Sequence, residues 1–148
     1  MLLEGPYGTG KTLCASVTAQ LCSRSGWTFV TVPHVKALKA ALQFAAGYQP
    51  CTVFVEDIDR DLSGERTSQM DDILNTVDGI VSKGSEIMVV LTSNDVTKIN
   101  RAMLRPGRLD AILHIDAPDG AAVQKLLRVY GGKLVKPDTD LSDAGAAL

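Results

Sequence analysis

Apolar residues recur along the chain in two alternating patterns. Short runs of apolar and β-branched residues, which are typical of buried strands, alternate with stretches whose apolar residues recur at helical spacing. The predicted strands are Met1–Leu3, Trp27–Val32, Cys51–Val55, Glu86–Leu91 and Ala111–Ile115. The predicted helices are Leu13–Ser25, His34–Ala46, a segment marked by Met70, Ile73, Leu74, Val77 and Val81, the short Asn100–Leu104, and Asp119–Tyr130. This alternation predicts an α/β fold in which a five-stranded parallel sheet lies between two layers of helices.

The apolar positions of the first two helices predict which of their faces enter the core. In the first helix these positions are Leu13, Cys14, Val17, Leu21 and Cys22. In the second helix, which we expect to begin near His34 and to end at Gly47, they are Val35, Leu38, Leu42 and Ala45. We also assign Phe44 to the core, because aromatic residues at helical spacing more often pack than bind.

Composition describes an ordinary globular protein. The 148 residues, 45% hydrophobic and 22% charged, are enough for one domain with a real core. The net charge of −2 gives no broad attraction to nucleic acid or acidic lipid. No apolar run approaches the length of a membrane span and no signal peptide precedes the first motif, so we expect a cytoplasmic protein without a membrane segment in this chain. Cys14, Cys22 and Cys51 lack metal-ligand spacing and are expected to be reduced core residues.

A glycine-rich loop follows the first predicted strand and leads into the first helix. It fits the phosphate-binding pattern G-x-x-x-x-G-K-[ST], with Lys11 placed for the β- and γ-phosphates and the Thr12 hydroxyl for Mg²⁺. The candidate nucleotide-binding residues are Gly5, Pro6, Tyr7, Gly8, Thr9, Gly10, Lys11, Thr12 and Leu13. By itself the match could also be a glycine-rich turn that fits by chance.

Adjacent acids end the buried strand Cys51–Val55. Glu56 and Asp57 follow it directly, which is the arrangement that a magnesium–nucleotide site needs, with one acid for the hydrated metal and one for the attacking water. Because successive strand residues point to opposite faces, we expect the two acids to have different roles. The alternative is a solvated strand-to-loop junction, where acids are common.

In these two motifs the chain resembles the AAA ATPase family, with motifs similar to those of FtsH and of the mitochondrial Rieske-protein translocase. Thr92-Ser93-Asn94 resembles the family's sensor-1 segment, and Leu74–Gly79 is similar to another family segment. The most specific match is the R-P-G-R-L-D stretch Arg105–Asp110. The resemblance covers Leu2 to about Tyr130 and implies a P-loop NTPase fold, ATP and Mg²⁺ as cofactors, and ATP hydrolysis.

The resemblance also implies roles for single residues. Asn94 would contact the attacking water or the γ-phosphate, and Arg105 and Arg108 would be arginine fingers that reach the ATP of a neighbouring subunit. Fingers used in this way require an oligomer, and the family forms rings that are usually hexameric. Thr12 and Glu56 would hold the metal, and Asp57 would orient the water.

The order of the two acids departs from the family's usual Asp-Glu. Here Glu56 takes the metal position and the shorter Asp57 takes the water position. A displacement of about 1 Å at the reacting water can cost on the order of 100-fold in rate. The same order occurs in the Rieske-translocase subfamily, so we expect slow but real turnover.

The substrate is expected to be a protein that a ring remodels or translocates. The aromatic-apolar-Gly loop of threading AAA proteins is missing between the second strand and its helix. The polar segment Asp61–Gln69 could line a pore, although a surface loop is the simpler interpretation. A nucleotide-dependent assembly module with little hydrolysis is the alternative function, and a nucleic-acid motor is disfavoured by the acidic balance and the lack of a basic-aromatic stripe.

The domain organisation is predicted as an AAA nucleotide-binding domain over residues 1–118 and the beginning of a helical lid over residues 119–148. Most of such a lid and any domain before Met1 are missing from this sequence, so we expect either a fragment or a reduced version of the family.

Overall fold

The computed structural model describes residues 1–61, 75, 77, 79, 84–95, 97, 99 and 109–146. The chain divides into two compact units, Met1–Ile115 and Asp116–Leu148. The first unit holds the sheet and every described residue of the predicted nucleotide site.

Five parallel strands form the sheet of the first unit, in the order β2-β3-β4-β1-β5. They are β1 (Leu2–Glu4), β2 (Thr28–Val32), β3 (Cys51–Val55), β4 (Ile87–Ser93) and β5 (Ile112–His114). This confirms the predicted fold class. Because parallel strands all end at one edge, the loops after β1, β3 and β4 lie together there.

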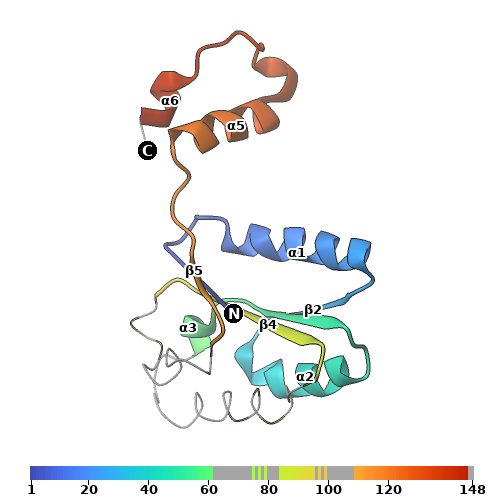
Figure 1. The fold of residues 1–148 in the computed structure, drawn as a ribbon. Coiled ribbons are helices and arrows are strands. Elements are labelled where there is room, and N and C mark those ends of the chain that lie inside the picture. Colours follow the sequence, from blue (N-terminus) through green and yellow to red (C-terminus); the bar gives the residue numbers. More distant parts are fainter. Residues whose placement is uncertain are drawn as a thin grey trace. The chain divides into compact units, whose positions relative to one another are not determined.

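The helices α1 (Lys11–Ser25) and α2 (Leu38–Ala46) lie on opposite faces of this sheet (Figure 1). β3 is buried along its whole length, as expected of a strand that is covered on both faces. Its side chains alternate between two core clusters, with Val53 and Val55 in the cluster of α2 and Phe54 in the cluster of α1. The three layers therefore meet at β3.

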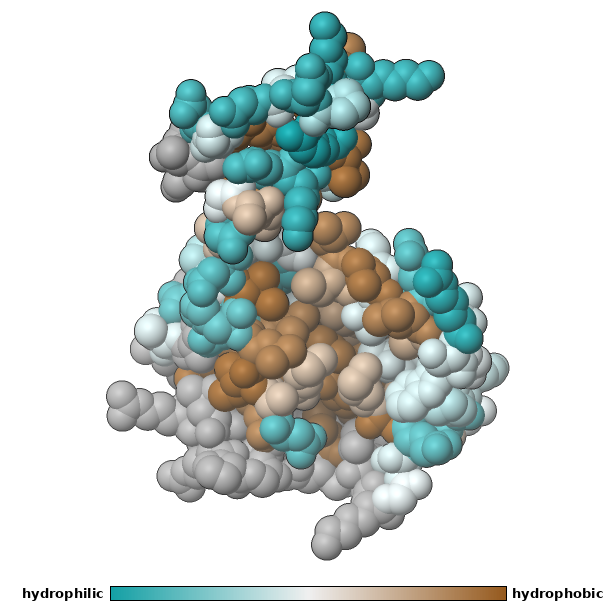
Figure 2. All heavy atoms as spheres, turned by 45° about the horizontal axis from the view of Figure 1, so that its top comes forward, coloured by the Kyte–Doolittle hydropathy of each residue, from teal (hydrophilic) through white to brown (hydrophobic). Residues whose placement is uncertain are grey.

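The predicted apolar face of α1 is wrong in part. Leu13, Val17 and Leu21 are 53%, 50% and 57% exposed, whereas Ala15 and Cys22 are buried. The helix turns small residues toward the sheet, since small side chains allow close approach, and Cys22 Sγ donates to Thr52 Oγ1 of β3 at 3.4 Å. Apolar side chains consequently gather on one face of this unit (Figure 2).

The second helix buries the residues predicted for its core face. Its first turn is a 3₁₀ helix, η1 (Val35–Ala37), that begins after His34 and continues into α2. Phe44 is a correction: it is 53% exposed and its ring stacks on Tyr48, with the centroids 4.4 Å apart. Phe44 lies two positions beyond the buried Leu42, which at 3.6 residues per turn places it on the outer face.

The cysteines are free thiols, as predicted. Cys22 and Cys51 are buried and Cys14 is half-buried. Burial raises the pKa of the Cys51 thiol, and Cys22 adds a smaller effect in the same direction. The thiol of Cys51 is therefore a packed core group rather than a reactive one.

A short helix, α3 (Ile58–Asp61), follows β3 directly, where the sequence predicted the start of a polar loop at Asp61. The rest of that loop, the predicted helix around Met70–Val81 apart from three single residues, and the predicted helix Asn100–Leu104 lie outside the described residues. Ile58 and Asp59 are both buried, so α3 is fixed against the sheet where the two acids lie.

The second unit is built around α5 (Gly120–Gly131), close to the predicted Asp119–Tyr130, followed by η3 (Gly132–Leu134) and α6 (Ser142–Ala146). Asp119 caps α5, because its Oδ1 accepts from the Ala122 amide at 2.7 Å. The Arg128 guanidinium donates to the carbonyl oxygens of Lys136, Pro137 and Thr139. This side chain ties the segment after η3 to α5.

Candidate nucleotide-binding site

The loop between β1 and α1 has the backbone geometry of an anion cradle. Gly8 and Gly10 have φ angles of 81° and 97°, in the left-handed region that favours glycine. Gly10 stands at the N-cap of α1 and has no side chain to cap it. The first amides of α1 and its positive dipole end are therefore available to a bound anion.

Gly5 anchors the start of this loop by close backbone approach. Its amide donates to the Ser93 carbonyl of β4 at 3.2 Å. A Cβ at this position would collide with the carbonyl oxygen of Ile115, which follows β5. The loop is thereby held between the strands on both sides of β1, and only glycine fits at its first position.

Lys11 is the first residue of α1 and is 5% exposed. Its ammonium donates to the carbonyl oxygens of Gly5 and Pro6 at 2.7 and 2.6 Å. The buried charge is therefore satisfied by the loop's own backbone, which offsets the cost of its desolvation. A phosphate would offer the same ammonium charged oxygens in place of these neutral ones.

Thr12 and Glu56 meet across the gap between α1 and the end of β3. The Thr12 hydroxyl donates to Glu56 Oε2 at 3.2 Å. A hydroxyl and a carboxylate oxygen side by side, next to a phosphate-binding loop, fit Mg²⁺, which takes few protein ligands and keeps waters and phosphate oxygens. Thr12 and Glu56 thus stay the predicted metal ligands.

Asp57 lies in the left-handed region, with φ 49°, and its surroundings hold it there. Its backbone amide donates to Thr92 Oγ1 at 2.9 Å, and its Oδ1 accepts from the Asn94 amide group at 2.9 Å. Arg60 of α3 lies 3.9 Å from its Oδ2. The structure therefore joins Asp57 and Asn94, two residues assigned to the attacking water.

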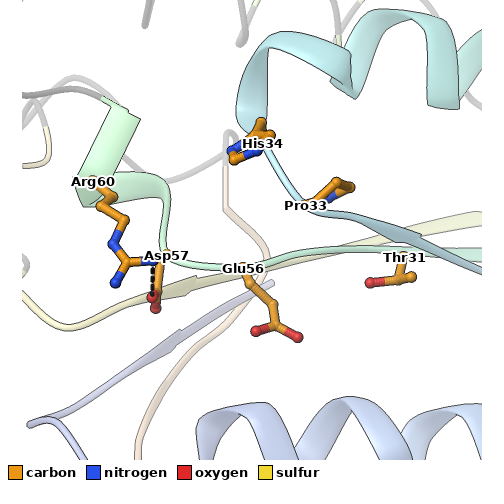
Figure 3. Close-up of a pocket in the computed structure, with 6 residues that line it drawn as sticks. All are labelled: Thr31, Pro33, His34, Glu56, Asp57 and Arg60. Carbon is orange, nitrogen blue, oxygen red and sulfur yellow. Dashed lines mark ion pairs between the residues drawn. The ribbon is translucent and has the colours of Figure 1, made fainter.

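The two acids do not point to opposite faces, as strand alternation had predicted. β3 ends at Val55, and the positive φ of Asp57 turns the chain, so that both carboxylates point to the same side in Figure 3. They nevertheless differ in partners, since Glu56 contacts Thr12 and Asp57 contacts Asn94. The division of roles between the two acids stays a prediction.

Comparison with known proteins decides the family. The sequence model described as "ATPase family associated with various cellular activities (AAA)" matches residues 1–117. The chain belongs to the AAA family. It is 30% identical over 154 residues to a probable 26S proteasome regulatory subunit 10B of Caenorhabditis elegans. It is 31% and 32% identical to the ATP-dependent zinc metalloproteases FtsH 4 and FtsH 3 of Synechocystis sp..

These matches cover most of the AAA chain but less than half of each relative. The aligned part is 91% of this chain and 37% of the nematode protein, and 24% and 26% of FtsH 4 and FtsH 3. Among the described residues of the AAA chain, no helix is long and apolar enough to cross a membrane. The chain therefore spans well under half the length of these relatives.

A cavity of about 280 Å³ opens beside the two acids of this AAA site. Figure 3 shows the lining residues that belong to the described part of the chain: Thr31, Pro33, His34, Glu56, Asp57 and Arg60. The end of β2, the residues just before η1 and the start of α3 thus border the two carboxylates. No motif along the chain indicated that His34 and Arg60 would lie here.

The other predicted site residues are either exposed to solvent or outside the described part of the chain. Leu13 is more than half exposed and Tyr7 is 74% exposed. Arg105 and Arg108, the predicted fingers of the AAA chain, lie outside the described residues.

Two buried residues at the AAA site were given no role from the sequence, although Thr92 belongs to the segment that resembles sensor 1. Thr92 and Asp59 are 1% and 3% exposed, and each is hydrogen-bonded across the gap between α3 and β4. One feature of the sequence could have indicated Asp59: it is a third acid in the short run Glu56–Asp59, and it directly follows the hydrophobic Ile58.

Proposed function

We propose that this AAA chain binds ATP in the loop after β1 and hydrolyses it to ADP and phosphate. One observation carries the proposal. Thr12 is paired with Glu56, and Asp57 with Asn94, at the same sheet edge as the phosphate loop. Hydrolysis of a phosphate anhydride needs positioning and charge stabilisation rather than covalent chemistry, and these pairs supply the positions.

The residues divide the work as follows. The loop amides and Lys11 bind the triphosphate, and Lys11 exchanges its carbonyl partners for phosphate oxygens. Thr12 and Glu56 would hold Mg²⁺, which supplies positive charge to the phosphate oxygens. Asp57 orients the attacking water, and Asn94 fixes Asp57 while offering its amide to the same region.

We expect slow hydrolysis, and for this reason an assembly module remains a second candidate function. Asp57 is one methylene shorter than the family's usual glutamate, and it is already engaged by Asn94 and Arg60. Both features favour an assembly module that binds ATP and hydrolyses little.

A phosphate-release assay with ATP tests the proposal and separates the two functions. We expect slow release that exceeds a Lys11→Ala control and disappears when EDTA removes Mg²⁺. Nucleotide binding without release above that control would favour the assembly module. Absence of any adenine-nucleotide affinity in calorimetry would contradict both.

We further propose that the protein works as a ring, hexameric as in the family, on a polypeptide substrate in the cytoplasm. Relatives named as a proteasome regulatory subunit and as ATP-dependent metalloproteases support a protein substrate. Residues 119–148 are proposed as the beginning of the helical lid. No nucleic-acid partner is expected, given the net charge of −2.

Substitution of the predicted arginine fingers tests whether the protein works as a ring. Arg105→Ala or Arg108→Ala should lower the rate of phosphate release on the order of 1,000-fold, because a finger neutralises charge as the γ-phosphoryl group leaves. Mixing Arg108→Ala chains with Asp57→Asn chains should restore activity, because some mixed sites combine an intact acid with a neighbour's intact finger. Arg24→Ala, at the exposed end of α1, is the matched control. A mixture that stays inactive would place the finger in the same chain as its ATP.

A further inference from the structure

A closed set of hydrogen bonds joins the acids after β3 to the end of β4. The Asp57 amide donates to Thr92 Oγ1 at 2.9 Å, and Asn94 Nδ2 donates back to Asp57 Oδ1 at 2.9 Å. The third hydrogen bond brings in Asp59, whose Oδ1 accepts from the Asn94 backbone amide at 3.0 Å. Asn94 is therefore held at its backbone by one acid while its side chain holds the other.

Asp59 is the buried member of this set. It is 3% exposed, whereas Glu56 and Asp57 are half-buried and line the cavity. A buried carboxylate is costly unless hydrogen bonds satisfy it, so its place against the Asn94 amide is strongly determined. Because it is buried and does not line the cavity, Asp59 is a poor candidate for contact with nucleotide.

A role confined to its own helix does not explain this geometry. Asp59 belongs to the four-residue helix α3, but its carboxylate bonds an amide 35 residues later in the sequence, at the end of another strand. Asp57 and Asn94 come from those same two segments. Their relative position therefore depends on what keeps α3 and the end of β4 in register.

We propose that Asp59 is a positioning residue for ATP hydrolysis. It fixes the backbone of Asn94, and through the Asn94 side chain it fixes the carboxylate that orients the attacking water. The inference rests on the proposed function, and it predicts an effect on turnover much larger than any effect on nucleotide binding. Asp59 has no described hydrogen bond to the phosphate loop, which meets this set only where the Gly5 amide donates to the Ser93 carbonyl.

Two substitutions at this position separate positioning from mere burial. Asp59→Ala removes the acceptor, and kcat should fall about 10- to 100-fold, the cost of a misplacement near 1 Å, with the Kd for a non-hydrolysable ATP analogue unchanged within about twofold. Asp59→Asn keeps an oxygen acceptor at the same place and should retain most of the wild-type kcat. Glu86→Ala removes an exposed acid just before the other end of β4 and is the matched control.

A double substitution tests whether Asp59 acts through Asn94. Asp59→Ala combined with Asn94→Ala should be no slower than Asn94→Ala alone, within about threefold, because the two residues act in series. A loss of rate in the double variant equal to the product of the two single losses would overturn the proposal. So would a wild-type kcat for Asp59→Ala, or an Asp59→Asn variant as slow as Asp59→Ala.

Hydrogen exchange supplies a readout that does not need activity. The Asn94 backbone amide should exchange at least about tenfold faster in Asp59→Ala than in the wild type, and it should stay protected in Asp59→Asn. Unchanged protection in Asp59→Ala would overturn the positioning role. If the wild-type chain released no phosphate, the proposed function would fail, whereas the exchange comparison would still decide whether Asp59 fixes Asn94.

Discussion

Lys11→Ala should weaken ATP binding by at least about 30-fold and remove measurable hydrolysis. That factor is the lower end of the loss when one partner of a buried, hydrogen-bonded charge pair is truncated. Lys11 is 5% exposed and has both of its described contacts in the phosphate loop, so no surface lysine can replace it. Calorimetry with ATP and Mg²⁺ measures the affinity, and phosphate release measures the rate.

Lys39→Ala is the matched control, because Lys39 is exposed on α2 and far along the chain from the loop. Circular dichroism of both variants shows whether the fold survives. An affinity within about threefold of wild type in a folded Lys11→Ala variant would remove the loop from the binding site, since such a value lies well below the expected loss.

Asp57→Asn should lower kcat about 100-fold or more, with the affinity for ATP unchanged within about twofold. An orienting base contributes on the order of 100-fold or more, and the asparagine side chain loses the charge that attracts a water proton. It keeps an oxygen at the Oδ1 position, so the Asn94 hydrogen bond at 2.9 Å can still form. Single-turnover phosphate release and calorimetry on the same preparation separate the two quantities.

Asp138→Asn, an exposed acid of the second unit, controls for the loss of one negative charge. A wild-type rate for Asp57→Asn would overturn the role of Asp57 and would transfer the orienting function to another group at the site. An equal loss of affinity and rate would show instead that the substitution disturbs the loop.

The two central strands β3 and β4 could be predicted because each is a continuous apolar run that is buried along all or nearly all of its length, whereas the edge strand β5 is exposed. β3 and β4 were placed within one or two residues, and their parallel order followed from the alternation with helices. The buried face of α2 was also predicted, since Leu38 and Leu42 recur at strict helical spacing. Where apolar residues recur at a clear helical spacing, that spacing predicts which face of the helix is buried.

The face of α1 and the place of Phe44 could not be predicted in the same way. In α1, small residues and large apolar residues both recur every fourth position, and only the distance to β3 decides which set is buried. Phe44 is large and apolar, but its outward position follows from the angle between it and Leu42. Hydrophobicity alone does not distinguish these cases.

The candidate site was predicted where its residues are consecutive and missed where they meet through the fold. Lys11, Thr12, Glu56 and Asp57 belong to two short motifs that can be recognised along the chain. The contact between Asp59 and the Asn94 amide joins segments 35 residues apart, and no spacing rule indicates it. Likewise, the left-handed turn at Asp57 became evident only from the backbone.

The meeting of Gly5 with Ile115 has a consequence for which positions tolerate change. Both sides of that approach are main-chain atoms, because the space a Cβ would need at residue 5 is filled by a peptide oxygen. As far as this approach is concerned, position 115 accepts any amino acid whose backbone follows the same path. Position 5 accepts glycine only. Of the two positions in contact, one therefore tolerates substitution and the other does not.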